Sequence, residues 1–132
     1  MEHASKCWDE RYNCAESVLR GVAHAQGLEL GDQAKMLATP FGGGVGRSED
    51  LCGALAGGAM GIGLVLGRRS AEDDRLRSYD AAGKLFRAFR DRFGATSCIA
   101  LNKSDFSSPA HRPRCGEYVR EATRLALETI RG

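Results

Sequence analysis

Apolar residues recur at intervals of three and four along most of this 132-residue chain, and no alternating run of strand length occurs. This period is typical of amphipathic α-helices. It predicts helices over residues 14–26, 32–37, 51–67, 72–93 and about 115–130, with a further short helix at residue 98. We therefore expect an all-α fold, a single compact helical domain over residues 1–132 with about five to six helices and a Gly-rich central helix.

The central segment, residues 51–67, is almost uncharged and carries Gly53, Gly57 and Gly61 on one helical face. It is short for a membrane span and has no aromatic belt, so we expect a buried helix that does not span a membrane. Glycine costs up to about 1 kcal/mol relative to alanine in a helix, which close packing must offset. Another helix, a symmetry mate in a homodimer, or a bulky inorganic cofactor beside Cys52 could fill the groove.

Charge patterning argues against nucleic acid as a partner. The chain has 19 basic and 17 acidic residues, a net charge of +2, and the two signs are interleaved even in the Arg-rich segment 68–92. Apolar side chains recur along the other face of the helix predicted there, and we expect them to pack in the core: Leu76, Tyr79, Phe86, Phe89 and Phe93.

The first eleven residues are polar and lack a secretory h-region. We therefore expect a cytoplasmic protein, in which spaced cysteines favour metal or redox chemistry over static disulfides.

Four of the five cysteines stand where helices are predicted to begin: Cys14, Cys52, Cys98 and Cys115. The start signals are Asn13 (with Glu16 three residues later), Ser48, Ser97 and Pro113. A helix N-terminus carries about half a positive charge, so a thiol there is expected to lose its proton more easily. Any one of these cysteines is most simply interpreted as a small residue buried in the core. Four cysteines at predicted helix starts instead favour a role in metal or redox chemistry.

The segment 52–57, Cys-Gly-Ala-Leu-Ala-Gly, matches a Cys-Gly-Ala-x-x-Gly signature. With 12–16 (Tyr-Asn-Cys-Ala-Glu), 41–47 (Phe-Gly-Gly-Gly-Val-Gly-Arg), Phe93-Gly94 before Cys98, and Cys115 ahead of a Tyr-Val-Arg-Glu-Ala helix, the chain resembles the C_GCAxxG_C_C family of small redox-active proteins. The family is similar to the non-haem part of split-Soret cytochromes. Cys7 falls outside its pattern.

The resemblance implies an iron–sulfur cluster, [2Fe–2S] or [4Fe–4S], bound by Cys14, Cys52, Cys98 and Cys115, with Gly53 beside it. Covalent haem is not implied, because the chain has no Cys-x-x-Cys-His. The protein would be an electron carrier or redox sensor, working with a redox partner protein that the sequence does not identify, rather than a substrate-converting enzyme. Arg47 could add a positive charge beside Cys52.

Three alternatives stay open at this point. The chain could be a thiol–disulfide protein without metal, in which Cys14 or Cys52 attacks and another cysteine resolves. The four sulfurs could hold a structural zinc ion, although the usual short-range cysteine pair is absent. A helical interaction domain with buried cysteines is the third. The three histidines, His3 in a tail, His24 near a helix end and His111 in a loop, are expected to be solvated rather than ligands.

Overall fold

The computed structural model describes residues 1–132, and every regular element in it is helical. The elements are α1 (Glu2–Asp9), α2 (Cys14–Ala25), α3 (Asp32–Ala38), the 3₁₀ turn η1 (Thr39–Phe41), α4 (Gly42–Val45), α5 (Gly53–Leu66), α6 (Leu76–Phe93), α7 (Cys98–Leu101) and α8 (His111–Arg131). Since α4 and α7 are single turns, the expectation of an all-α domain of about five to six helices is confirmed.

Helix α2 shows how local sequence sets a helix start. The Asn13 side chain accepts from the Glu16 backbone N–H, and the Glu16 carboxylate accepts from the Asn13 N–H, both at 2.9 Å. This reciprocal pair satisfies two donors that a helix end would otherwise leave unpaired. The predicted inner face is also confirmed, because Ala15, Val18 and Val22 are fully buried.

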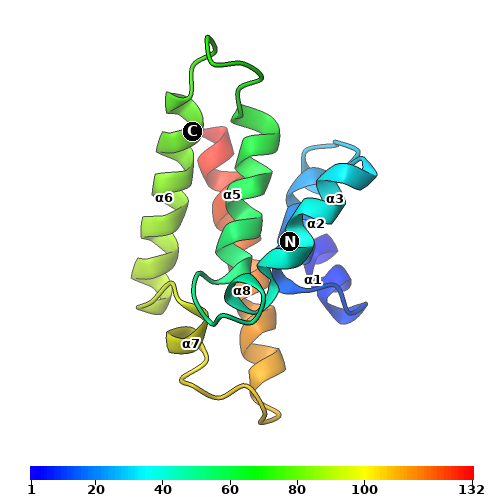
Figure 1. The fold of residues 1–132 in the computed structure, drawn as a ribbon, viewed down its shortest axis with the longest axis vertical. Helices are drawn as coiled ribbons and strands as arrows, with labels where there is room; N and C mark the ends of the chain where they lie inside the picture. Colours follow the sequence, from blue (N-terminus) through cyan, green and yellow to red (C-terminus); the bar gives the residue numbers. More distant parts are fainter.

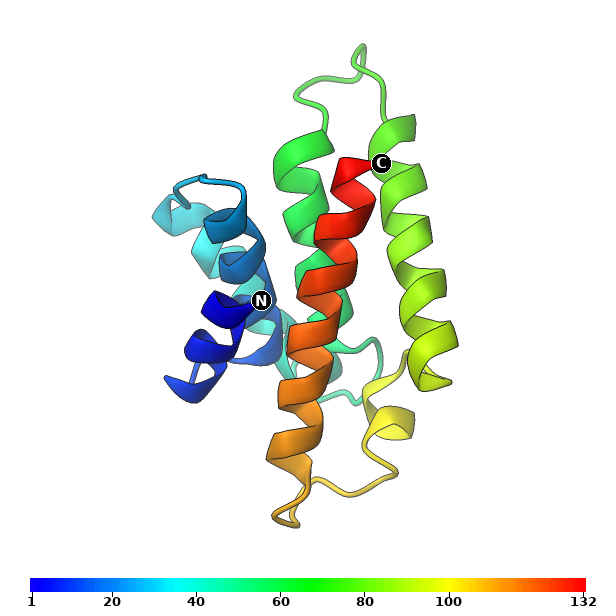
Figure 2. The same ribbon diagram turned by 180° about the vertical axis from the view of Figure 1, so that it is seen from behind.

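The long helices α5, α6 and α8 run side by side, and α2 packs across α5 and α8 (Figures 1 and 2). Their shared core contains Ile62 from α5, Leu85 and Phe89 from α6, and Val119 from α8, each with at most 1% of its surface exposed. The chain begins α5 and α8 at the same end of this bundle, and α6 finishes there. The connections at that end therefore lie close together.

The space beside Gly57 and Gly61 of α5 is occupied by α2, a neighbouring helix of the same chain. A Cβ at Gly57 would lie 2.5 Å from the carbonyl oxygen of Ala15, and one at Gly61 would lie 2.8 Å from the Val22 side chain. Close packing of α2 on α5 thus offsets the helix-propensity cost of these glycines. The homodimer stays a prediction, but Gly57 and Gly61 no longer argue for it.

Two sequence expectations about helix faces and ends were wrong. Residues 2–9 form α1, which packs on α2, although the polar segment suggested a tail. In α6 the buried face holds Ala81, Leu85 and Phe89, whereas Leu76 and Tyr79 are 60% and 64% exposed. A continuous i, i+4, i+8 line reaches the core. Phe93 also packs against it, on Phe89 and Tyr118, whereas Phe86 is 38% exposed.

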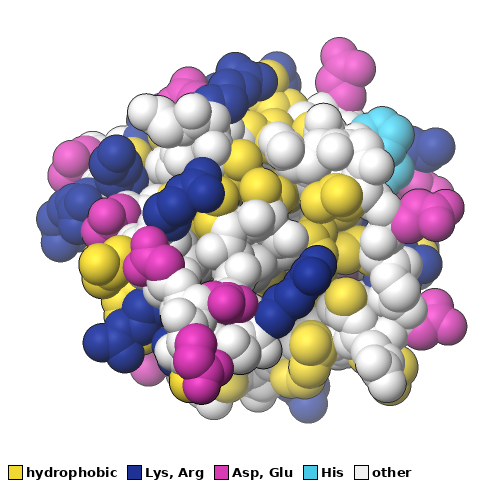
Figure 3. All heavy atoms as spheres, turned by 90° about the horizontal axis from the view of Figure 1, so that it is seen from above, with side chains coloured by type: hydrophobic (Ala, Val, Ile, Leu, Met, Phe, Trp, Pro, Cys, Tyr) yellow, Lys and Arg dark blue, Asp and Glu magenta, His cyan; other side chains and the backbone are white.

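The surface seen from above intersperses basic and acidic side chains around a mixed centre (Figure 3). This face has no single-sign patch of the kind that attracts nucleic-acid backbones. None of the helices combines the length and the apolar character needed to cross a membrane.

Candidate functional site

The four cysteines of the predicted pattern, hereafter the family cysteines (Cys14, Cys52, Cys98 and Cys115), come from four separate segments near one end of the bundle. Cys14 is the first residue of α2, and Cys98 is the first residue of α7, capped by the Ser97 hydroxyl. Both placements confirm the prediction.

The other two family cysteines differ from the predicted placement. The helix expected to open at Ser48 begins only at Gly53, so Cys52 is its N-cap and residues 46–52 form a loop. Helix α8 begins at His111, which puts Cys115 in its second turn and Pro113 at its third residue. Proline is tolerated there because the first four N–H groups of a helix have no intrahelical partner.

A short backbone ladder holds two of these cysteines side by side. The N–H of Cys52 donates to the carbonyl of Thr96 at 2.9 Å, and the N–H of Cys98 donates to the carbonyl of Asp50 at 2.5 Å. These bonds flank an isolated antiparallel bridge between Leu51 and Ser97. The loop before α5 and the loop before α7 are therefore locked together.

Close contacts around the cysteines admit only glycine. A Cβ at Gly53 would lie 2.3 Å from Cys14 Sγ, so the absent side chain is what allows Cys14 to reach the start of α5. Gly44, at φ +70°, would place a Cβ 2.6 Å from the Asp50 N–H nitrogen and 2.8 Å from Cys98 Cβ. The Gly-rich segment 42–46 therefore folds tightly against the cysteine loops instead of cradling a phosphate.

A cavity of about 340 Å³ opens between these segments. Its lining residues are Trp8, Asn13, Cys14, Gly43, Arg47, Glu49, Cys98, Phe106, His111 and Cys115. Three family cysteines face it, whereas Cys52 is 6% exposed and lies outside the lining. Cys7 is buried in α1 and does not contribute to this cavity. Arg47 lines the cavity, although Cys52, beside which its charge was expected, does not.

The pKa values of the four thiols are raised, whereas the sequence led us to expect that a thiol at a helix start loses its proton more easily. Burial, followed by the charge of nearby Cys14, raises the pKa of Cys52 to about 12. Burial, then Cys14 and Cys98, raises the pKa of Cys115 to about 11. The pKa values of Cys14 and Cys98 are also raised, chiefly by burial. The helix-terminus effect is present but smaller, because desolvation and mutual repulsion outweigh the amide dipoles.

Backbone amides nevertheless point at two of the sulfurs. Hydrogen bonds from the amides of Gly43 and Ala15 act to lower the Cys14 pKa, and those of Ala54 and Leu55 act likewise on Cys52. Such N–H groups stabilise negative charge on sulfur. The site therefore suits thiolates once a cation or cluster removes their protons.

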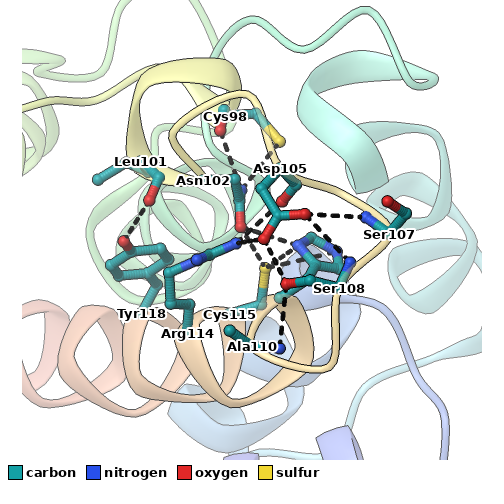
Figure 4. A network of polar contacts seen from close by, with 11 residues as sticks. Cys98, Leu101, Asn102, Asp105, Ser107, Ser108, Ala110, Arg114, Cys115 and Tyr118 are labelled. Carbon is teal, nitrogen blue, oxygen red and sulfur yellow. Dashed lines mark hydrogen bonds and ion pairs between the residues drawn. The ribbon is translucent and has the colours of Figure 1, made fainter.

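A polar network closes the site between α7 and α8 (Figure 4). The buried Asn102 contacts both Cys98 and His111, and Asp105 forms an ion pair with Arg114 at 3.2 Å. Ser108 donates its hydroxyl to Asp105, whose pKa is lowered to about 2 mainly by hydrogen bonds from Ser108. The residues from Asn102 to Arg112, expected to be a simple surface loop, are thus tied to the cysteines.

Sequence reasoning missed Asn102 and dismissed His111. His111 is the first residue of α8, lines the cavity, and has Nδ1 3.8 Å from Cys115 Sγ. Its spacing of four residues from Cys115 would have indicated a shared helical face had the helix start been placed correctly. No spacing rule marks Asn102. His3 also differs from expectation, since it lies in α1 and stacks on His24 with ring centroids 4.1 Å apart.

The side chains do not form a ready single-ion site. No three Cys, His, Asp or Glu side chains converge closely enough to hold one metal ion. The family cysteines are nevertheless near enough for Cys14 to raise the pKa of each of the other three.

Comparison with known proteins agrees with the four-cysteine pattern. The model of a family described as "Putative redox-active protein (C_GCAxxG_C_C)" matches residues 12–129. The chain belongs to the C_GCAxxG_C_C family. The matched range contains every family cysteine and excludes Cys7, as the resemblance implied. Membership in this redox-active family supports a redox role.

One relative is an uncharacterized protein of Archaeoglobus fulgidus. It is 30% identical over 133 residues, an alignment that covers 93% of this chain and 87% of the relative. No solved structure matches the chain.

Proposed function

We propose that this protein binds one iron–sulfur cluster, [2Fe–2S] or [4Fe–4S], through the four family cysteines and acts as an electron carrier or redox sensor. The observation that carries the proposal is that Cys14, Cys98 and Cys115, distant in sequence, line one cavity at one end of the helical bundle. The fourth family cysteine, Cys52, lies behind the lining, close enough for Cys14 and Cys98 to raise its pKa. Four thiolates are the usual ligand number for such clusters, which supply one-electron redox chemistry when bound.

The charge and hydrogen-bond donors of the site fit that group. An oxidised cluster with four thiolates carries about two negative charges. The amides beside Cys14 and Cys52 would stabilise this charge, and Arg47 on the cavity wall adds a cation. Because all four thiols have raised pKa values, cluster binding must release protons, and affinity is expected to rise with pH.

The geometry favours a cluster over the alternatives. A structural zinc ion needs four ligands around one centre, whereas no three candidate side chains converge to that degree. A thiol–disulfide protein with Cys14 or Cys52 as the attacking thiol needs a thiolate near neutral pH, whereas burial raises the pKa of Cys14 and raises that of Cys52 to about 12. A pure interaction domain gives no reason for the amides directed at Cys14 and Cys52.

The test is a visible absorption spectrum with iron and acid-labile sulfide analysis on protein purified without oxygen. We expect a brown protein with matched iron and sulfide. Colourless protein that takes up neither after anaerobic reconstitution would contradict the proposal. Reversible loss of free thiols on mild oxidation of that colourless protein would then favour thiol–disulfide chemistry, and stoichiometric zinc would favour a structural site.

A further inference from the structure

Asn102 is a buried amide placed between two family cysteines. Only 2% of its surface is exposed. Its Nδ2 donates to the Cys98 carbonyl oxygen at 2.9 Å and lies 3.7 Å from Cys98 Sγ. Its Oδ1 lies 2.8 Å from His111 Nδ1 and 3.6 Å from Cys115 Sγ. One side chain thus contacts both cysteines and the histidine where α7 meets α8, within the network of Figure 4.

The amide orientation fixes the tautomer of His111. The Cys98 carbonyl oxygen can only accept, so the NH₂ group of Asn102 must face it and Oδ1 must face His111. Because Oδ1 is also only an acceptor, Nδ1 of His111 must carry the ring hydrogen. In a neutral imidazole, Nε2 then holds a free electron pair, and it lies 3.9 Å from Cys115 Sγ.

We propose that Asn102 is the positioning residue of the redox site: it gives an amide hydrogen to the sulfur of Cys98 and holds His111 in the Nδ1–H tautomer beside Cys115. The part that concerns the sulfur rests on the proposed function. A hydrogen bond to a ligand sulfur stabilises the extra negative charge of the reduced state and so raises the reduction potential. His111 in this tautomer has no Nε2 hydrogen to offer Cys115. Cys98 Sγ therefore accepts a hydrogen bond from the Asn102 amide, whereas Cys115 Sγ accepts none from His111.

The first test uses the metal-free protein and the ¹⁵N chemical shifts of His111 at a pH where the ring is neutral. We expect the Nδ1–H tautomer in the wild type. In Asn102→Asp a carboxylate oxygen still accepts from Nδ1, so this hydrogen is retained, whereas Asn102→Leu removes the acceptor and lowers the Nδ1–H population. A wild-type ring protonated at Nε2 would overturn the proposal, and this result needs no folded variant.

The second test measures the midpoint potential of the cluster-loaded protein. Asn102→Asp removes the N–H donor and adds a charge, whereas the control Asn13→Asp adds a charge at the cavity wall without removing a donor to sulfur, because Asn13 Nδ2 donates to the Thr39 carbonyl. We expect a more negative potential in Asn102→Asp than in Asn13→Asp. Equal shifts would overturn the role at Cys98. Protein without iron would overturn the proposed function instead, and the tautomer result would still decide the placement of His111.

Discussion

Two glycine-rich stretches lie next to each other in the sequence but serve different physical ends. In α5, Gly57 and Gly61 have ordinary helical backbone, and their missing side chains let α2 approach. In segment 42–46, Gly43, Gly44 and Gly46 have positive φ, and the chain folds back onto the cysteine loops. The first stretch packs the bundle, and the second shapes the cavity.

Gly53 stands where the two stretches meet. It is helical like Gly57, but the atom nearest to the space that it leaves is Cys14 Sγ, with the Phe41 carbonyl oxygen next. The difference indicates that Gly57 and Gly61 are needed for the packing of α5 on α2, whereas Gly53 is needed for the position of Cys14 in the site. Substitutions along the two stretches should therefore separate stability from cofactor binding.

The largest effect is expected at the α2–α5 contact. In Gly57→Ala the new methyl group would meet the Ala15 carbonyl oxygen, which cannot move without shifting α2. We expect a loss of about 3 kcal/mol in the free energy of unfolding. Gly63→Ala, on the same helix with open space around it, should instead stabilise the protein by up to about 1 kcal/mol. Urea denaturation of both variants measures this, and equal effects would refute the packing argument.

The next largest effect is expected at Gly44. Alanine there combines a left-handed backbone, which costs about 1–2 kcal/mol, with the contact on Asp50. Gly46→Ala has the same kind of backbone, at φ +59°, and open space. We expect Gly44→Ala to destabilise the protein by about 2–3 kcal/mol and Gly46→Ala by about 1 kcal/mol. Thermal or urea unfolding would show no such gap if the loop did not press on the cysteine segments.

A smaller loss of stability, with a larger loss of cofactor, is expected at Gly53. The methyl group of Gly53→Ala would displace Cys14 Sγ, a side-chain atom that can rotate away, and would press on the Phe41 carbonyl oxygen at 2.8 Å. We expect a cost of about 1–2 kcal/mol, with iron bound per chain falling well below the wild-type value. The matched comparison is Gly57→Ala measured under folding conditions. Full iron content in Gly53→Ala would contradict the assignment of Cys14 as a ligand of the cluster.

A dependence of stability on pH is also expected to arise at the cysteine end. In the metal-free protein the pKa of Cys52 is about 12, whereas the unfolded thiol ionises near its ordinary value of 9.0. Above about pH 9 the folded state therefore holds more protons than the unfolded state, and stability falls as pH rises toward 12. Denaturation at several alkaline pH values should show a shallower fall in Cys52→Ser. An identical slope would mean that Cys52 is not the buried thiol responsible.

Much of the bundle could be predicted from the sequence because it follows from local rules. The capping box of Asn13 and Glu16, the buried face of α2, and the αL end of α6 at Gly94 all depend on neighbouring residues. Helix α1 could not be predicted in this way, because its polar sequence becomes helical by packing Ala4 and Cys7 under α2 and α8. Tertiary contact overrides weak local signals in such segments.

For the site, the sequence identified the cysteines and the structure supplied their surroundings. Motif resemblance separated Cys7 from the family cysteines, but the direction of the thiol pKa shifts depends on burial, which spacing alone does not reveal. The start of α8 was misplaced because Pro113 is compatible with both the first and the third helical residue. That error hid the shared face of His111 and Cys115. Asn102 gains its role only from the fold.

The most direct test of the central claim is iron and acid-labile sulfide per chain in five single Cys→Ser variants, each reconstituted without oxygen. The account predicts wild-type stoichiometry and spectrum in Cys7→Ser, because Cys7 lies in α1 away from the cavity. It predicts loss of the cluster, or an altered spectrum, in each of the four family-cysteine variants. A loss in Cys7→Ser, or an unchanged cluster in Cys52→Ser, would contradict the assignment of these four sulfurs to one site.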